Sequence, residues 1–140
     1  DMVSLAKKHL HAIVTVGQIK LPAFRIKLFN MAVKAGFVLP NITSPRSYVS
    51  KHAIIGDGTI IMHDVLINAN VTIDDNCIIN SKALIEHDCI ISKHCHISTN
   101  AIINGSVIVE SECFVGSGSI IKESITVNKG SFIKAGTVVK

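Results

Sequence analysis

The stretch LIEHDCIISKHCHI, residues 84–97, contains the densest group of reactive side chains in the protein, with three histidines and two acids. A neutral imidazole accepts a proton near pH 7, and a neighbouring carboxylate fixes its tautomer and favours the imidazolium as it forms. His87 and Asp88 are such a pair. The same cluster could also be a metal site or the polar edge of a structural element. The choice depends on the elements that position the histidines.

The composition favours strands and excludes several classes of protein. Apolar residues make up 48% of the 140 residues and charged residues 17%, and the β-branched Ile and Val greatly outnumber Leu. The net charge of +4 comes without a dense Lys/Arg stripe, so nucleic-acid binding is not expected. No apolar run approaches the roughly 18 residues that span a bilayer, and no signal-peptide pattern opens the chain. We therefore expect a cytoplasmic protein without membrane insertion.

An aliphatic residue recurs every six positions from Val49 to Val139, and all sixteen of these positions are Ile or Val. Four residues after each of them lies a column of small or modest side chains, which includes all four cysteines. Gly, Asn and Asp are frequent at the third position and tolerate tight-turn backbone. Each hexad therefore predicts a short strand and a sharp turn. The cysteines are expected to be small buried hydrophobes, not metal ligands or disulfides.

This pattern of aliphatic–x–x–(Gly/Asn/Asp)–small–x, unbroken over residues 49–140, resembles the hexapeptide repeat of left-handed parallel β-helix acyltransferases. The resemblance implies a mainly β fold in which three hexads make one triangular coil. About five coils would stack roughly 4.8 Å apart. It also implies a β-helix acetyltransferase domain over residues 42–140. The resemblance further implies that the chain forms a homotrimer with active sites between subunits.

Residues 1–41 do not follow the repeat and predict a short α/β remnant. The segment 10–16 is typical of a strand, and Pro22 opens a segment with helical periodicity that stops at Gly36. This strand–helix–strand order resembles the end of the nucleotide-sugar-binding-like domain that precedes the β-helix in bacterial sugar acetyltransferases. The Gly-rich first strand and turn of that domain is missing, and the chain starts with Asp, so a fragment is expected.

The stretch NSKALIEHDCIISKHCHIS, residues 80–98, resembles the active-site segment of acetyltransferases that modify nucleotide-activated 4-amino sugars, and of related sialic acid O-acetyltransferases. By this resemblance His87 is the general base. Asp88 is the acid that raises its basicity and also contacts the substrate, and Asn80 lines the same pocket.

Acetyl-CoA is the co-substrate that the resemblance implies, with no metal. Its binding is assigned to His96, Gly105, Ser117, Ala135 and Gly136. Gly105 should stack over His87 one coil higher, where the lack of a side chain lets CoA approach and a backbone N–H can stabilise an oxyanion. His96 lies half a coil from His87, in a column otherwise held mostly by apolar side chains.

The expected reaction is direct acetyl transfer to the amino group of a nucleotide-activated sugar in surface glycan biosynthesis. O-acetylation of a sialic-acid-like sugar is the alternative acceptor class. A non-catalytic trimeric β-helix scaffold and a zinc hydratase built on the same fold are alternatives of other classes. The known zinc hydratases of this fold have two histidines five residues apart and a third about two coils earlier. His87, His94 and His96 are spaced by two, seven and nine residues, which does not match that pattern.

Two further histidines have open roles. His63 and Asp64 repeat the His–Asp pair in an earlier hexad, but they lie one coil and one face before His87 and should not share its stack. His94 occupies a turn position and could be solvated or could contact a neighbouring subunit's site.

Overall fold

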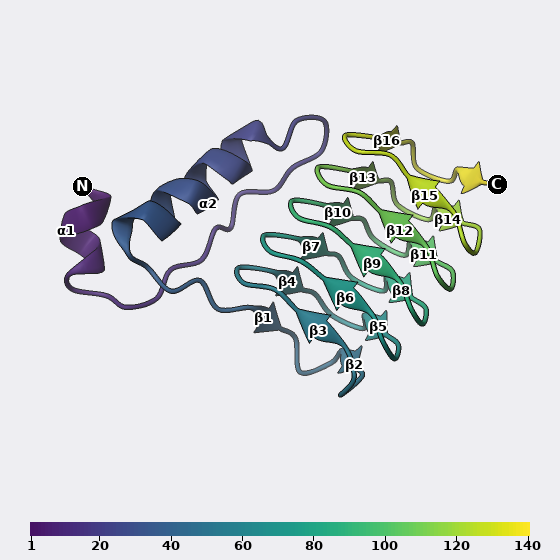
Figure 1. Cartoon of the computed structure of the whole chain (residues 1–140), viewed down its shortest axis with the longest axis horizontal. Helices are drawn as coiled ribbons and strands as arrows, with labels where there is room; N and C mark the ends of the chain where they lie inside the picture. The colour runs from purple at the N-terminus through teal and green to yellow at the C-terminus, as the bar shows by residue number, and fades with distance from the viewer.

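Three parallel sheets wind around one axis and form a β-solenoid of about five turns (Figure 1). The computed structural model describes all residues from 1 to 140. The sixteen strands from β2 to β17 each end on an Ile or Val of the six-residue column. The fold class predicted from the repeat is therefore confirmed.

The strands are two residues long, and neighbours in each sheet lie 18 residues apart. The first sheet contains β1 (Ile42–Thr43), β4 (Ile60–Ile61), β7 (Ile78–Ile79), β10 (His96–Ile97), β13 (Phe114–Val115) and β16 (Phe132–Ile133). The second contains β2 (Tyr48–Val49), β5 (Leu66–Ile67), β8 (Leu84–Ile85), β11 (Ile102–Ile103), β14 (Ile120–Ile121) and β17 (Val138–Val139). The third contains β3 (Ile54–Ile55), β6 (Thr72–Ile73), β9 (Ile90–Ile91), β12 (Ile108–Val109) and β15 (Thr126–Val127).

Turns join the sheets at three corners, which run along the length of the solenoid. The first corner, between the first and second sheets, includes residues 62–64, 80–82, 98–100, 116–118 and 134–136. The second corner, between the second and third sheets, includes 68–70, 86–88, 104–106 and 122–124. The third corner, between the third and first sheets, includes 56–58, 74–76, 92–94, 110–112 and 128–130. Most corners close on a residue with positive φ, for example Asn70 at 62° and Asp88 at 60°.

The aliphatic column fills the interior of the solenoid, where Ile79, Ile85 and Ile91 are fully buried. All four cysteines are buried and free of disulfides. Burial raises the pKa of the Cys89 thiol, which disfavours a reactive thiolate. The cysteines are packing groups, as their column predicts.

Two helices precede the solenoid, α1 (Met2–Ala6) and α2 (Ala23–Ala35). The second follows Pro22 and ends at Gly36, whose φ is 94°, as the sequence predicts. Its buried residues are Arg25, Phe29 and Ala32. Arg25 is 1% exposed, whereas the apolar Val33 is 51% exposed. Neither helix has the length and apolar character needed to cross a membrane.

The strand expected over residues 10–16 does not form. A single parallel bridge joins His11 to Val38. The Arg25 guanidinium explains this difference, because its Nη1 donates to the carbonyl oxygens of Val14 at 2.6 Å and Val16 at 2.8 Å. Those carbonyls therefore bond to a side chain and not to a neighbouring strand.

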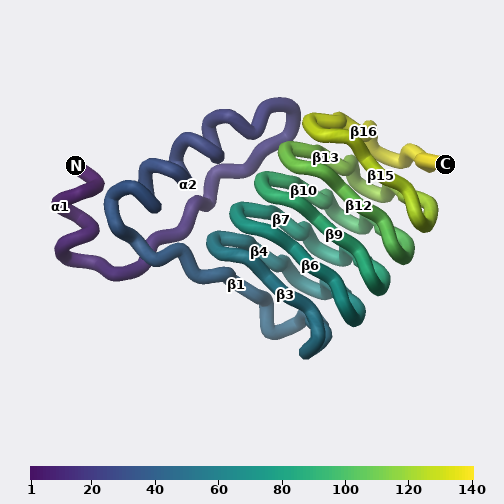
Figure 2. The backbone as a smooth tube through the Cα atoms, viewed as in Figure 1, coloured from purple at the N-terminus to yellow at the C-terminus, as the bar shows by residue number.

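The segment before α2 and the helix itself pack along the first sheet and the third corner (Figure 2). The Phe29 ring meets the His94 ring edge-on, with 5.9 Å between centroids. A Cβ at Gly58 would lie 2.8 Å from the Phe29 ring, so this corner has no room for a side chain. We call this contact region the α2 seam.

Candidate active site

His87 and Asp88 form a close pair on the second corner. His87 Nδ1 lies 2.7 Å from Asp88 Oδ2, and the His87 side chain is 63% exposed. An ionised carboxylate only accepts hydrogen bonds, so Nδ1 donates and Nε2 keeps its lone pair. Hydrogen bonds from His87 and then from Asn70 lower the pKa of Asp88, which keeps it ionised.

Gly105 covers the His87 ring from one coil above, as the 18-residue coil predicts. A Cβ built at Gly105 would lie 2.9 Å from His87 Cε1 and 3.0 Å from Nε2. The Gly105 amide donates no hydrogen bond within the chain. The second corner therefore places a basic nitrogen beside a free N–H, the pair that acyl transfer uses.

His96 and Asn80 lie elsewhere, on the first sheet and the first corner. His96 is 8% exposed, its Nδ1 lies 2.6 Å from the backbone oxygen of Gln18, and Asn80 Nδ2 lies 3.3 Å from its Nε2. Because a carbonyl only accepts, His96 carries its proton on Nδ1. Burial lowers the pKa of His96, and the nearby Arg25 adds to this effect while the bond to Gln18 opposes it. His96 is thus a neutral, oriented imidazole near pH 7.

Ser117, Ala135 and Gly136 continue up the same first corner, and all three are exposed. Ser117 Oγ lies 2.9 Å from Ser98 Oγ, and the Gly136 amide donates to the Ser117 carbonyl at 2.9 Å. Gly116 is needed beneath them, because a Cβ there would lie 2.5 Å from the Ala135 nitrogen.

The structure thus divides the expected site residues into two groups. His87, Asp88 and Gly105 lie on the second corner, whereas the remaining five, Asn80, His96, Ser117, Ala135 and Gly136, lie on or beside the first. One face of the solenoid separates the corners, and six extended residues span about 20 Å. Three surface cavities, of about 460, 460 and 170 Å³, lie around the helices and the third corner, and none is lined by any of these residues.

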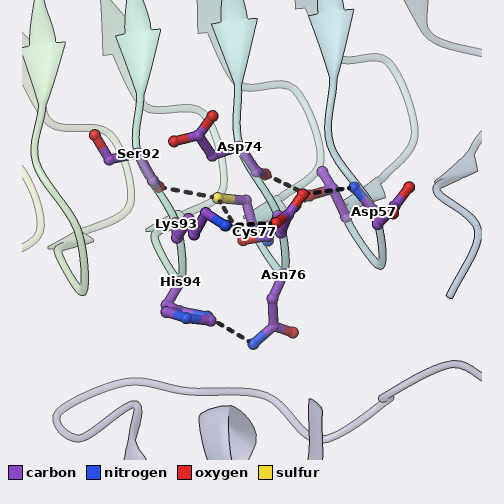
Figure 3. A network of polar contacts seen from close by, with 9 residues as sticks. Asp57, Asp74, Asn76, Cys77, Ser92, Lys93 and His94 are labelled. Carbon is purple, nitrogen blue, oxygen red and sulfur yellow. Dashed lines mark hydrogen bonds and ion pairs between the residues drawn. The ribbon is translucent and has the colours of Figure 1, made fainter. Parts of the chain in front are cut away.

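His94 is not a solvated turn residue but part of the α2 seam. Figure 3 shows it facing Asn76 at the third corner, where Asn76 Nδ2 lies 3.0 Å from His94 Nδ1. At the same corner, Lys93 Nζ pairs with Asp75 Oδ2 at 2.8 Å. Gln18 Nε2 donates to the His94 carbonyl at 2.7 Å. Within the chain this histidine serves docking of the N-terminal segment.

His63 and Asp64 do not repeat the geometry of the His87 pair. His63 Nδ1 lies 2.7 Å from Ser44 Oγ, while the Asp64 carboxylate accepts two short hydrogen bonds from Arg46, at 2.7 and 2.9 Å. No three His, Cys, Asp or Glu side chains gather into a metal-binding group.

We expect the free energy of unfolding to decrease as the pH falls below about 6.5, the value for an unfolded histidine. Burial lowers the pKa of both His94 and His96 in the fold, with a further lowering by Arg25. Below about pH 6.5 the unfolded chain therefore binds more protons at these two histidines than the folded chain does. The stabilisation is complete above the pKa of the unfolded histidines and is lost as the pH falls through the lower pKa values of the folded ones. Thermal melts between pH 8 and pH 5 measure this effect. The double variant His94→Gln, His96→Gln should lose most of the dependence, and a melting temperature that is flat in the parent would contradict it.

Residues 52–87 match the family model described as bacterial transferase hexapeptide (six repeats). No curated protein matches the chain. The acetyltransferase domain of PglB from Neisseria gonorrhoeae, solved with acetyl coenzyme A, is 27% identical with a TM-score of 0.89. That comparison covers 99% of this chain and 68% of the solved domain's chain.

PerB from Caulobacter crescentus, solved with CoA and GDP-perosamine, is 25% identical with a TM-score of 0.72, over 91% of this chain and 69% of PerB. WeeI from Acinetobacter baumannii shares the fold, at 22% identity and a TM-score of 0.71, over 93% of this chain and 68% of WeeI.

The β-helix and the hexapeptide repeat matched over residues 52–87 make the chain similar to acetyltransferases of the hexapeptide-repeat family. Among these proteins it resembles the acetyltransferase domain of PglB and the perosamine N-acetyltransferase of Caulobacter crescentus.

Proposed function

We propose that the chain transfers the acetyl group of acetyl-CoA to the amino group of a nucleotide-activated sugar. The observation that carries this proposal is the His87–Asp88 pair, whose free Nε2 lies under the Gly105 backbone. The relatives support it, because PglB was solved with acetyl coenzyme A and PerB with CoA and GDP-perosamine.

In the proposed mechanism the acceptor amine attacks the thioester carbonyl carbon while His87 Nε2 removes its proton. Asp88 stabilises the resulting imidazolium through Nδ1. The Gly105 N–H donates to the oxyanion of the tetrahedral intermediate. Collapse of the intermediate breaks the C–S bond, and the imidazolium returns the proton to the CoA sulfur. No covalent intermediate on the enzyme is needed.

We further propose that the two groups of site residues meet across a subunit interface in a homotrimer. The outward side chains of the second sheet form an apolar ladder: Tyr48, Leu66, Leu84, Ile102, Ile120 and Val138. Tyr48 and Val138 at its ends are 62% and 55% exposed. If each subunit turns this sheet toward a threefold axis, the second corner of one subunit meets the first corner of the next. His87 then faces the row that contains Asn80, His96 and Ser117.

Calorimetric titration with acetyl-CoA tests the proposal. The parent should bind saturably, and Ser117→Trp should weaken binding at least about tenfold, because an indole would fill the space beside the first corner. Ser111→Trp is the matched control, since it places the same side chain at the same turn position on the third corner. Absence of binding by a folded parent would contradict the proposal.

The acceptor is tested with GDP-perosamine and with a free sialic acid, followed by mass spectrometry of the products. Transfer to the amine of the first supports the proposed reaction. Transfer to a hydroxyl of the second alone would replace it with O-acetylation.

A further inference from the structure

Asn70 lies directly below Asp88 on the second corner, one coil closer to the N-terminus. Its Nδ2 donates to Asp88 Oδ1 at 3.1 Å, while the other carboxylate oxygen, Oδ2, contacts His87 Nδ1 at 2.7 Å. The carboxylate thus bridges an amide in one coil and the imidazole in the next. The Asp88 carboxylate has no other hydrogen-bond partner in the chain.

The Asp88 side chain needs such an anchor because it is 50% exposed and is not held by packing. The backbone at Asn70 and Asp88 has nearly the same positive φ, 62° and 60°, so the two side chains leave the corner from equivalent positions. The hydrogen bond from Asn70 also contributes to the lowered pKa of Asp88, after the larger contribution of His87.

A second amide in the same coil holds the other acid that flanks the histidine. Asn68 Nδ2 donates to Glu86 Oε2 at 2.7 Å. The coil below therefore engages both carboxylates, and only Asp88 contacts His87.

We propose that Asn70 is a positioning residue, which holds the Asp88 carboxylate so that Oδ2 faces His87 Nδ1 and Nε2 stays free to accept a proton. This inference rests on the proposed function, in which His87 is the base. Asn70 acts through Asp88 and contacts neither substrate nor reacting atoms.

Asn70→Ala tests the inference, and Asn100→Ala is its matched control. Asn100 is exposed, has a φ of 58° and makes no side-chain hydrogen bond. The control therefore makes the same Asn-to-Ala change at a turn position with the same backbone conformation. Loss of one hydrogen bond to a charged group should lower kcat about threefold to tenfold. The KM for acetyl-CoA should not change, and Asn100→Ala should keep the parent kcat.

Asn70→Asp separates orientation from packing. It keeps the shape of the side chain but places a second carboxylate below Asp88, which should turn Asp88 away through like-charge repulsion. We expect its kcat to be lower than that of Asn70→Ala. An equal or higher kcat would overturn the electrostatic part of the inference.

The tautomer of His87, measured by long-range ¹H–¹⁵N correlation spectra, gives a readout that needs no substrate. The parent should show Nδ1 protonated, and Asn70→Ala should shift the population toward protonated Nε2, while Asn100→Ala should not. If the protein acetylates nothing but the tautomer shifts as expected, the proposed function fails and the positioning role stands. An unchanged tautomer in Asn70→Ala, or the same change in Asn100→Ala, would overturn the inference.

Discussion

Replacing His87 with alanine should lower kcat by about 10²- to 10⁴-fold, the usual contribution of a positioned general base. The fold should be unaffected, because the side chain is largely exposed and its hydrogen bond is to the exposed Asp88. Steady-state rates of CoA thiol release measure the effect, and the circular dichroism melt reports on the fold. Acetyl-CoA binding should change little, since the imidazole acts on the acceptor.

His63→Ala is the matched control for that experiment. It removes the histidine of the other His–Asp sequence pair, whose ring bonds to Ser44 and not to its neighbouring acid. We expect nearly full activity in this variant. Parent-like activity in His87→Ala would exclude His87 as the base.

Gly105→Ala should lower kcat about tenfold to a hundredfold. The added methyl would lie 2.9 Å from His87 Cε1 and 3.0 Å from Nε2, so the ring must move away from the position in which it accepts the proton. Displacements of about 1 Å at a catalytic group have effects of this size. Rates of acetyl transfer and a crystal structure of the variant measure the loss and the shift.

Gly17→Ala controls for the general effect of adding a methyl group, because nothing lies within 4 Å of a Cβ at that position. We expect it to behave as the parent. If Gly105→Ala is equally active, the close contact between the glycine and the imidazole has no catalytic importance.

The β-helix could be predicted from the sequence because its determinants are local and repeated. Each inward Ile or Val meets the equivalent residue 18 positions away, so one rule places Ile85 and Ile103 on the same stack. The same rule predicts that Gly105 covers His87, and the structure has this contact. Asn70 was missed, although its spacing of 18 from Asp88 would have revealed it.

The N-terminal segment could not be predicted in the same way because its contacts are not periodic. The buried Arg25 lies on the packed face of α2 and bonds to backbone carbonyls, which prevents the expected strand. No pattern in the sequence links Gln18 to His96, 78 residues further on, yet the Gln18 carbonyl fixes the tautomer of that histidine. Such pairings depend on how the segment docks at the α2 seam.

The hexad spacing places the expected site residues on two corners, because His96 lies half a coil from His87. The resemblance groups His87 with His96 in one site, but half a coil places them on different sides of the same solenoid. Within a single chain one face of the solenoid, about 20 Å across, separates them. The proposed subunit interface resolves this separation.

The most direct test of that account is the activity of mixed oligomers made from His87→Ala and Ser117→Trp chains. Each variant alone should be nearly inactive. Every site lacks the His87 imidazole in the first variant, and in the second the indole fills the acetyl-CoA space beside the first corner. Co-expression in equal amounts should restore about one quarter of the parent activity, since a random neighbour pair has both intact halves about one time in four. Mixed oligomers that are seen by native mass spectrometry but stay inactive would contradict a site shared between subunits.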